Sequence, residues 1–287
     1  MATLILFFLG AAFGSFLNVV ALRYDPEKSL FDNGVLNGRS YCPGCEKTLR
    51  WFELIPLVSF VIQRAKCRTC SIGISPRYFF IEIICGLIFI LVPFRLGIPL
   101  ITSFFALHSL FIAVLWSFVL LSLILMTLID FKWMIIPDEL NIFFIILGIL
   151  LLSFHGFDLL PAKSFLGVPS VLLGGGGWEW QTHVAGLLGA FAFFVFLVFV
   201  TRGRGMGIGD VKLAAALGLI FGSPDIIFLI VTAFVLGGGI GALALFSRKK
   251  TMKSAIPFGP FLAFGACTLF FFGERLVEGY VSFMLTN

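Results

Sequence analysis

The sequence predicts an all-α polytopic membrane protein with about eight transmembrane helices and a small cytosolic cysteine domain between the first two. Three observations support this fold class. Of the 287 residues, 60% are hydrophobic and only 12% are charged, whereas about 25% are charged in an average soluble domain. Apolar runs long enough to cross a bilayer recur along the chain. One polar segment with two cysteine pairs interrupts them.

The apolar runs and the basic residues together predict a topology. We expect spans near residues 2–22, 78–94, 100–129, 139–154, 183–201, 209–222, 225–246 and 257–280. The first is expected to remain as a span, because no basic residue precedes it as in a signal peptide. With both chain ends outside, all but three of the 20 Lys and Arg residues face the cytosol. Topology thus explains the net charge of +5, and no nucleic-acid partner is expected.

The polar segment of residues 24–77 is predicted to hold a metal ion. Its two C-x-x-C pairs are separated by 21 residues and comprise Cys42, Cys45, Cys67 and Cys70. Four thiolates at such spacing typically bind one structural Zn²⁺ in a zinc-ribbon-like domain. A segment of this size has a small core, which a bound metal would stabilise. The alternative is that the cysteines form two redox pairs or are unrelated.

Two aspartates at the ends of apolar runs are the candidate catalytic residues. Asp130 ends an inward span and Asp210 begins an outward one, so both lie at the cytosolic face. Carboxylates beside hydrocarbon are costly and usually functional. Two that lie close together share a proton, which allows one to activate water and the other to polarise a carbonyl group. Asp138 is the alternative first partner, with helix capping as its structural role. The structural alternatives are an ion pair with Lys132 for Asp130 and helix capping for Asp210.

Residues around Asp210 are expected to support this pair. Gly207 and Gly209 allow the backbone to pass close to a substrate or to the other aspartate. Lys212 would either tune the carboxylates or anchor its helix at the interface.

The motifs, in their order, resemble those of the bacterial prepilin peptidases of type IV pilus and type II secretion systems. The resemblance covers most of the chain and includes the double C-x-x-C segment and five further elements. These are Gly14-Ser15-Phe16-Leu17-Asn18-Val19, Ser75-Pro76-Arg77-Tyr78 with Glu82, Asp130 with Ile136-Pro137-Asp138, Gly205-Met206-Gly207-Ile208-Gly209-Asp210-Val211-Lys212, and Pro257-Phe258-Gly259-Pro260.

The resemblance implies an intramembrane aspartic endopeptidase of the bacterial inner membrane. Its members remove the basic leader of prepilins or pseudopilins after a glycine at the cytosolic face, and Asp130 and Asp210 match their catalytic pair. They also methylate the new N-terminus with S-adenosylmethionine. This implies a first helix at 1–23, a methyltransferase-associated four-cysteine domain at 24–77 and a protease domain at 78–287, embedded in lipid. Glu82 either faces the methyl-transfer site and its cofactor or pairs with Arg77.

Ala65 departs from the family pattern. The family usually has R-G-K-C before the second cysteine pair, whereas this chain has Arg64-Ala65-Lys66-Cys67. If the backbone there needs a positive φ, alanine is strained. Two hypotheses therefore remain, a peptidase with methyltransferase activity and a peptidase that has lost or weakened it. A third, from another class, is a metal-binding membrane transporter or adaptor with the two aspartates along an ion path. The sequence does not predict the oligomeric state.

Overall fold

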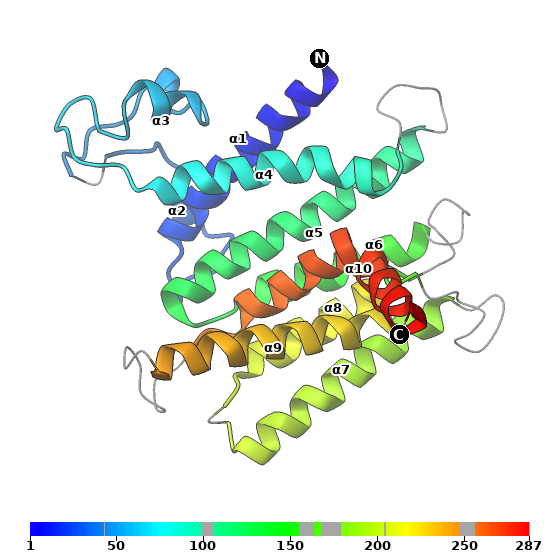
Figure 1. Ribbon diagram of the computed structural model, residues 1–287. Coiled ribbons are helices and arrows are strands. Elements are labelled where there is room, and N and C mark those ends of the chain that lie inside the picture. The colour runs from blue at the N-terminus through cyan, green and yellow to red at the C-terminus, as the bar shows by residue number, and fades with distance from the viewer. Residues whose placement is uncertain are drawn as a thin grey trace. The chain divides into compact units, whose positions relative to one another are not determined.

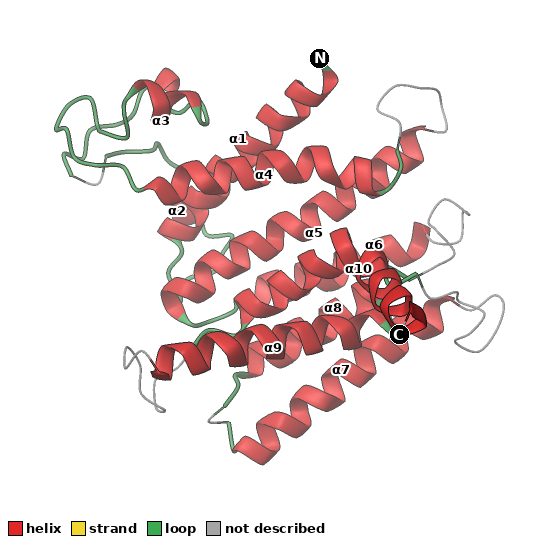
Figure 2. Ribbon diagram, viewed as in Figure 1, coloured by secondary structure: helices red, strands yellow, loops and turns green. Residues whose placement is uncertain are grey.

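The computed structural model describes residues 1–42, 44–98, 106–154, 164–167, 179–203, 205–246 and 256–286. Within these ranges the regular elements are helices, joined by loops (Figures 1 and 2). The chain divides into two compact units, Met1–Leu121 and Ser122–Asn287. The boundary falls inside one long helix, α5 (Ala106–Trp133).

The first unit is built on a close pair of long helices, α1 (Ala2–Arg23) and α4 (Pro76–Arg95). They approach closely because small residues of α1 face α4: a Cβ atom at Gly14 would lie 2.9 Å from the Cα of Glu82. Helix α4 begins at Pro76, whose fixed φ suits a first helical position, and the Ser75 hydroxyl caps it.

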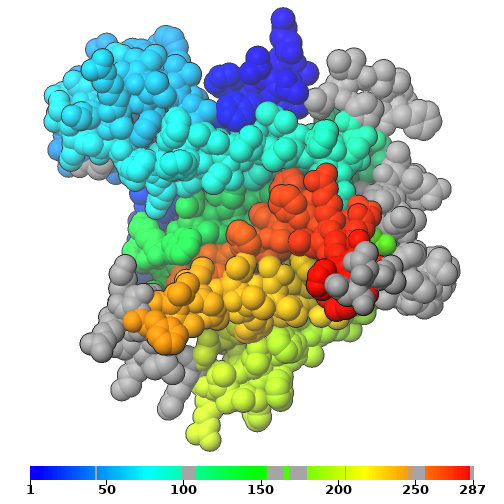
Figure 3. Space-filling view, viewed as in Figure 1, coloured from blue at the N-terminus to red at the C-terminus, as the bar shows by residue number. Residues whose placement is uncertain are grey.

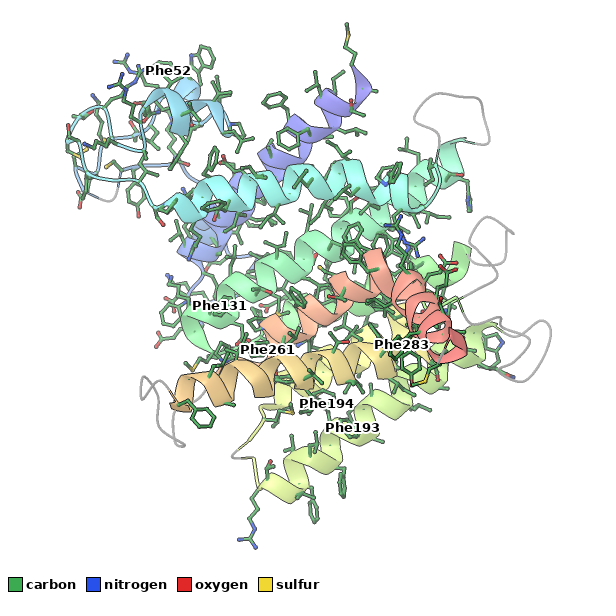
Figure 4. The ribbon with its side chains drawn as sticks, viewed as in Figure 1. Phe52, Phe131, Phe193, Phe194, Phe261 and Phe283 are labelled. Carbon is green, nitrogen blue, oxygen red and sulfur yellow. The ribbon has the colours of Figure 1, made fainter. Side chains whose placement is uncertain are left out.

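The segment between α1 and α4 forms a lobe with little regular structure, coloured blue to cyan in Figure 3. In the described part of this segment, the helices are the short α2 (Asn33–Leu36), η1 (Trp51–Glu53) and α3 (Val58–Ile62). The guanidinium of Arg68 lies 5.2 Å from the centre of the Phe52 ring, which is labelled in Figure 4. This cation–π contact joins η1 to the second cysteine pair.

The second unit is assembled around α8 (Ile208–Phe221), whose residues from Val211 onward are mostly buried. Helices α6 (Asp138–Phe154) and α7 (Glu179–Thr201) pack against it, and α10 (Gly259–Thr286) packs against α9 (Asp225–Phe246). A helix that is apolar on all sides belongs in such an interior position.

Aromatic side chains join α7, α9 and the residue that precedes α10 in this unit. The ring of Phe194 lies 6.1 Å from those of Phe234 and Phe258, which are 5.0 Å apart. Phe193, next to it on α7, is 42% exposed whereas Phe194 is fully buried; both are labelled in Figure 4. One face of α7 thus packs on its neighbours while another is exposed.

A helix covers the described part of each of the eight expected apolar runs, so the predicted all-α polytopic fold is confirmed. Residues 100–105 of the expected run 100–129 lie outside the described residues. Among the described residues, six helices have the length and composition to cross a membrane: α1, α4, α5, α7, α9 and α10. The other two are shorter, with 17 residues in α6 and 14 in α8. At about 1.5 Å per residue, α8 is about 21 Å long, less than the hydrocarbon core of a bilayer.

The packing of α7 on α8 predicts the effect of one methyl group. A Cβ atom at Gly186 would lie 2.6 Å from the carbonyl oxygen of Gly218, so Gly186→Ala should force the two helices apart. We expect a loss of about 1–3 kcal/mol, measured as a lower midpoint of thermal unfolding in detergent. Gly189→Ala on the same helix is the control, because its Cβ would meet nothing within 4 Å. Equal midpoints for the two variants would contradict this packing.

Candidate functional site

Asp130 lies in the last turns of α5 and is only 4% exposed. Its Oδ2 atom accepts a hydrogen bond of 3.0 Å from the backbone N–H of Gly259, the first residue of α10. The first N–H groups of a helix have no partner within it and carry the positive end of its dipole. A Cβ atom at Gly259 would lie 2.6 Å from the same oxygen, so only glycine brings the backbone this close.

Asp210 lies in the first turn of α8 and is half-buried. Its Oδ2 atom accepts a hydrogen bond of 3.1 Å from the N–H of Gly207, which precedes the helix. This contact caps α8, the structural role that the sequence allowed for Asp210 as an alternative to catalysis. It also fixes the direction of the carboxylate.

The structure brings these two aspartates into one region of the second unit. Gly209 packs against the segment that follows α5, since a Cβ atom there would lie 3.2 Å from the Cβ of Ile136. Both carboxylates are thus held by backbone N–H groups beside a close backbone contact, an arrangement able to bind and activate water.

Asp138 and Lys212 form an ion pair beside this region. The Lys212 Nζ atom lies 2.7 Å from Asp138 Oδ1, and the two side chains are 46% and 66% exposed, respectively. Asp138 is the first residue of α6. Exposed pairs of this kind contribute about 0–1 kcal/mol. The pair joins the start of α6 to α8, while Lys132 lies over the Trp133 ring, 4.8 Å from its centre.

The four cysteine sulfurs of the first unit form one cluster. The Sγ atoms of Cys42, Cys45, Cys67 and Cys70 all lie within 4.8 Å of one another, and those of Cys42 and Cys70 are 3.7 Å apart. A metal ion held tetrahedrally by sulfur at about 2.3 Å needs sulfurs about 3.8 Å apart. The donor set and its spacing therefore fit a metal ion.

The two cysteine pairs are held by turns of the same construction. The N–H of Cys42 donates to Lys47 O at 3.0 Å, and that of Cys67 donates to Ile72 O at 2.9 Å. Each turn is closed by an isolated antiparallel bridge. Backbone N–H groups of Cys70 and Thr69 lower the pKa of Cys67 to about 6, which favours the thiolate that binds metal.

Ala65 has a left-handed backbone conformation, which is unfavourable for alanine. Its φ is +57°, and that of Arg64 is +52°. The N–H of Ala65 donates to Phe60 O at 2.9 Å, and its own carbonyl accepts from Ile74 N at 2.7 Å. These bonds hold a left-handed conformation that costs about 1–2 kcal/mol in a residue other than glycine.

Glu82 is 7% exposed on α4. Its Oε2 atom accepts a hydrogen bond of 2.7 Å from the N–H of Leu57, which belongs to the cysteine segment. Among the described residues this contact, and not an ion pair with Arg77, holds the carboxylate. The sequence placed Glu82 correctly near the start of its span but gave no sign of Leu57.

Three buried residues were assigned no role from the sequence. Gly259 stood in a motif without a function, and its contact with Asp130 arises between helices distant in sequence. Asp225 accepts hydrogen bonds from the N–H groups of Phe165 and Leu166, at 2.7 and 3.4 Å, which fixes that short turn. The amide of Asn141 is buried and neither of its polar atoms has a partner among the described residues. In the sequence, only its position one turn after Asp138 could have marked Asn141 as a site residue.

Fold and geometry define a class: a polytopic helical membrane protein with a buried and a half-buried aspartate in one region and a separate four-cysteine cluster that fits a metal ion. Comparison with known protein families identifies the family within this class. Residues 8–96 match the bacterial peptidase A24 N-terminal domain, and residues 117–242 match the type IV leader peptidase family. No solved structure matches the chain.

Near full-length relatives agree with these matches. A prepilin leader peptidase/N-methyltransferase of Bacillus subtilis (strain 168) is 30% identical over 98% of each chain. Proteins of the same description from Stutzerimonas stutzeri and Pseudomonas aeruginosa are each 28% identical, over 96% of this chain and 92% of their own. The chain therefore belongs to the type IV leader peptidase family, with the N-terminal domain of its bacterial members.

The positive φ of Ala65 predicts that Ala65→Gly stabilises the cysteine segment. Relief of about 1 kcal/mol corresponds to about a fivefold change in local opening. We expect hydrogen exchange of the Ala65 and Ile74 amides, measured on the full-length protein, to slow by that factor. Gly73→Ala is a matched control, since its φ is not positive and its Cβ would meet nothing within 4 Å. Unchanged or faster exchange in Ala65→Gly would show that the strain is absent.

Proposed function

We propose that this chain removes the basic leader from type IV prepilins or type II secretion pseudopilins, cutting after a glycine, and then N-methylates the new N-terminus. The observation that carries the cleavage proposal is the pair of aspartates, each held by a backbone N–H in the second unit. The relatives that match nearly the whole chain are described as enzymes with both activities.

Asp130 and Asp210 are assigned as the catalytic pair. One carboxylate takes a proton from water, whose oxygen attacks the scissile carbonyl carbon, while the protonated partner donates a hydrogen bond to the carbonyl oxygen. Collapse of the intermediate breaks the carbon–nitrogen bond, and the leaving amine takes up a proton. Gly207 and Gly209 shape the backbone at this site, and Asp138 and Lys212 support it by joining α6 to α8.

Methyl transfer is assigned to the cysteine segment of residues 24–77, and cleavage to residues 78–287, with 1–23 as the first helix. The terminal nitrogen forms a bond to the methyl carbon of S-adenosylmethionine as the carbon–sulfur bond breaks, S-adenosylhomocysteine leaves, and the nitrogen loses a proton to water. The relatives' descriptions include this activity, so a chain with protease activity alone is not favoured. Nor is a transporter or adaptor, because the matching family is one of peptidases.

The expected location is the bacterial inner membrane, in lipid, with the catalytic site at the cytosolic face. The distribution of Lys and Arg supports this orientation. A substrate with a basic leader in the cytosol and an apolar segment in the bilayer would present its cleavage site at that depth.

The metal ion of the cysteine cluster is proposed to be Zn²⁺, held by Cys42, Cys45, Cys67 and Cys70. Zinc commonly binds four thiolates tetrahedrally in structural sites, and the close sulfurs support this assignment. Its role here would be to join the two cysteine turns.

Substitution of the aspartates tests the catalytic assignment. Asp130→Asn and Asp210→Asn keep similar volumes but remove one ionisable group each, so we expect at least about a thousandfold loss of leader cleavage. The measurement is cleavage of a prepilin by the purified protein in lipid. Asp138→Asn is the comparison and should retain most of the activity, because it breaks only an exposed ion pair. An inactive Asp138→Asn beside an active Asp130→Asn would transfer the first catalytic position to Asp138.

Metal content tests the cysteine assignment. Purified protein should contain about one zinc per chain by elemental mass spectrometry. The double variant Cys42→Ser with Cys67→Ser should lose the metal and show faster proteolysis of the cysteine segment. Cys267→Ser, outside the cluster, should keep both properties of the wild type. A metal-free protein with a fully protected segment would rule out a structural zinc.

A further inference from the structure

Glu82 joins α4 to the cysteine segment. It lies on α4, and its Oε2 atom accepts the N–H of Leu57 at 2.7 Å. A carboxylate buried to this degree needs such a donor, because it has lost most of its water. The hydrogen bond to Leu57 connects the helix pair to the cysteine segment.

The partner of Glu82 is a strained residue. Leu57 has φ +63° and ψ −51°, and the N–H of Val58 donates to Pro56 O at 2.6 Å. Together these describe a γ-turn with a positive central φ, a conformation that is rare and strained for leucine. Such a turn persists only where its surroundings hold it, and the carboxylate of Glu82 is the acceptor that holds its central N–H.

The strained turn leads directly to the second cysteine pair. Leu57 precedes α3 (Val58–Ile62), which ends next to Ala65 and the turn that holds Cys67. Phe60 of α3 stacks on Phe79 of α4, with ring centres 5.1 Å apart. The Glu82 bond and this stacking set the position of α3 on α4, and hence that of the second cysteine turn.

A second contact holds the other end of the cysteine segment. The Arg23 guanidinium, at the end of α1, donates to the carbonyl oxygens of Asn37, Gly38 and Arg39 at 2.8, 3.3 and 3.0 Å. These carbonyls lie just before the first cysteine pair. Each cysteine pair therefore follows a stretch of backbone that is hydrogen-bonded to a charged side chain of the helix pair.

We propose that Glu82 is a positioning residue for methyl transfer, which acts through the N–H of Leu57 by holding the cysteine segment in one position on α1 and α4. This inference rests on the proposed methyltransferase activity. It differs from a role in cofactor binding or proton transfer, because what the carboxylate supplies is a hydrogen-bond acceptor. A displacement of about 1 Å between reacting groups lowers a rate by about a hundredfold, so loss of this contact should slow methylation selectively.

The test compares two substitutions at one position. Glu82→Ala removes the acceptor and should lower the methylation rate of a cleaved prepilin by about tenfold or more, with leader cleavage within about twofold of wild type. Glu82→Gln keeps an oxygen at the same place, so methylation should stay within about threefold. If the methylation rate of Glu82→Gln falls as far as that of Glu82→Ala, methylation depends on the negative charge and the positioning role is wrong.

Hydrogen exchange supplies a readout that does not depend on the reaction. The amides of residues 57–62 should exchange faster in Glu82→Ala but not in Glu82→Gln. Leu57→Gly is the matched control: it keeps the N–H and accepts a positive φ without strain, so methylation should persist. Loss of cleavage as well in Glu82→Ala would indicate general destabilisation and overturn the proposal. A wild-type protein that cleaves but never methylates would instead refute the methyltransferase assignment, and faster exchange in Glu82→Ala would then show that the contact is only structural.

Discussion

A carboxylate inside an apolar helix has to obtain its hydrogen bonds from the chain itself, and the second unit is organised around that requirement. Asp130 is almost fully buried in α5, and the N–H of Gly259 supplies a donor to its carboxylate. This contact spans 129 residues of sequence and sets the first turn of α10 against the last turns of α5. Because any side chain at Gly259 would collide with the Asp130 carboxylate, the helix approach and the aspartate depend on the same glycine.

The same requirement is met differently in the first unit. Glu82 also takes a donor from a distant backbone, 25 residues away in sequence, but the donor belongs to Leu57 in a strained turn and not to a glycine at a helix start. Glycine allows close approach without strain, whereas leucine in this conformation has to be held by its contacts. The cysteine segment is thus bonded to the helix pair at Leu57, while the cluster of four sulfurs brings its own two turns together.

The sequence predicted those features that depend on local spacing. The apolar runs predicted the helices, because the length and composition of a run do not depend on what it packs against. The C-x-x-C spacing predicted the sulfur cluster, because each cysteine turn is formed within a few residues. The predicted topology puts Asp130 and Asp210 at one depth, and this stays a prediction. What it missed were partners from elsewhere in the chain: Gly259 for Asp130, Lys212 for Asp138 and Leu57 for Glu82. Hydropathy and charge carry no information on which backbone group meets which side chain. For Ala65 the sequence predicted strain only if the backbone there needs a positive φ. The structure shows that this φ is positive.

The two aspartates are held in unequal ways, and this bears on how such a pair would be assembled. Asp210 takes its N–H from Gly207, three residues away, so its orientation is fixed as soon as α8 forms. Asp130 takes its N–H from another helix, so its orientation is fixed only when α10 packs. A pair built in this way becomes complete in the tertiary fold and not in either helix alone. Two neighbouring carboxylates repel each other when both are ionised. The packing of α10 supplies the N–H of Gly259 to Asp130, and this hydrogen bond offsets part of that repulsion. The position of α10 therefore governs Asp130 while leaving Asp210 unchanged, and motion at the start of α10 would alter one member of the pair alone.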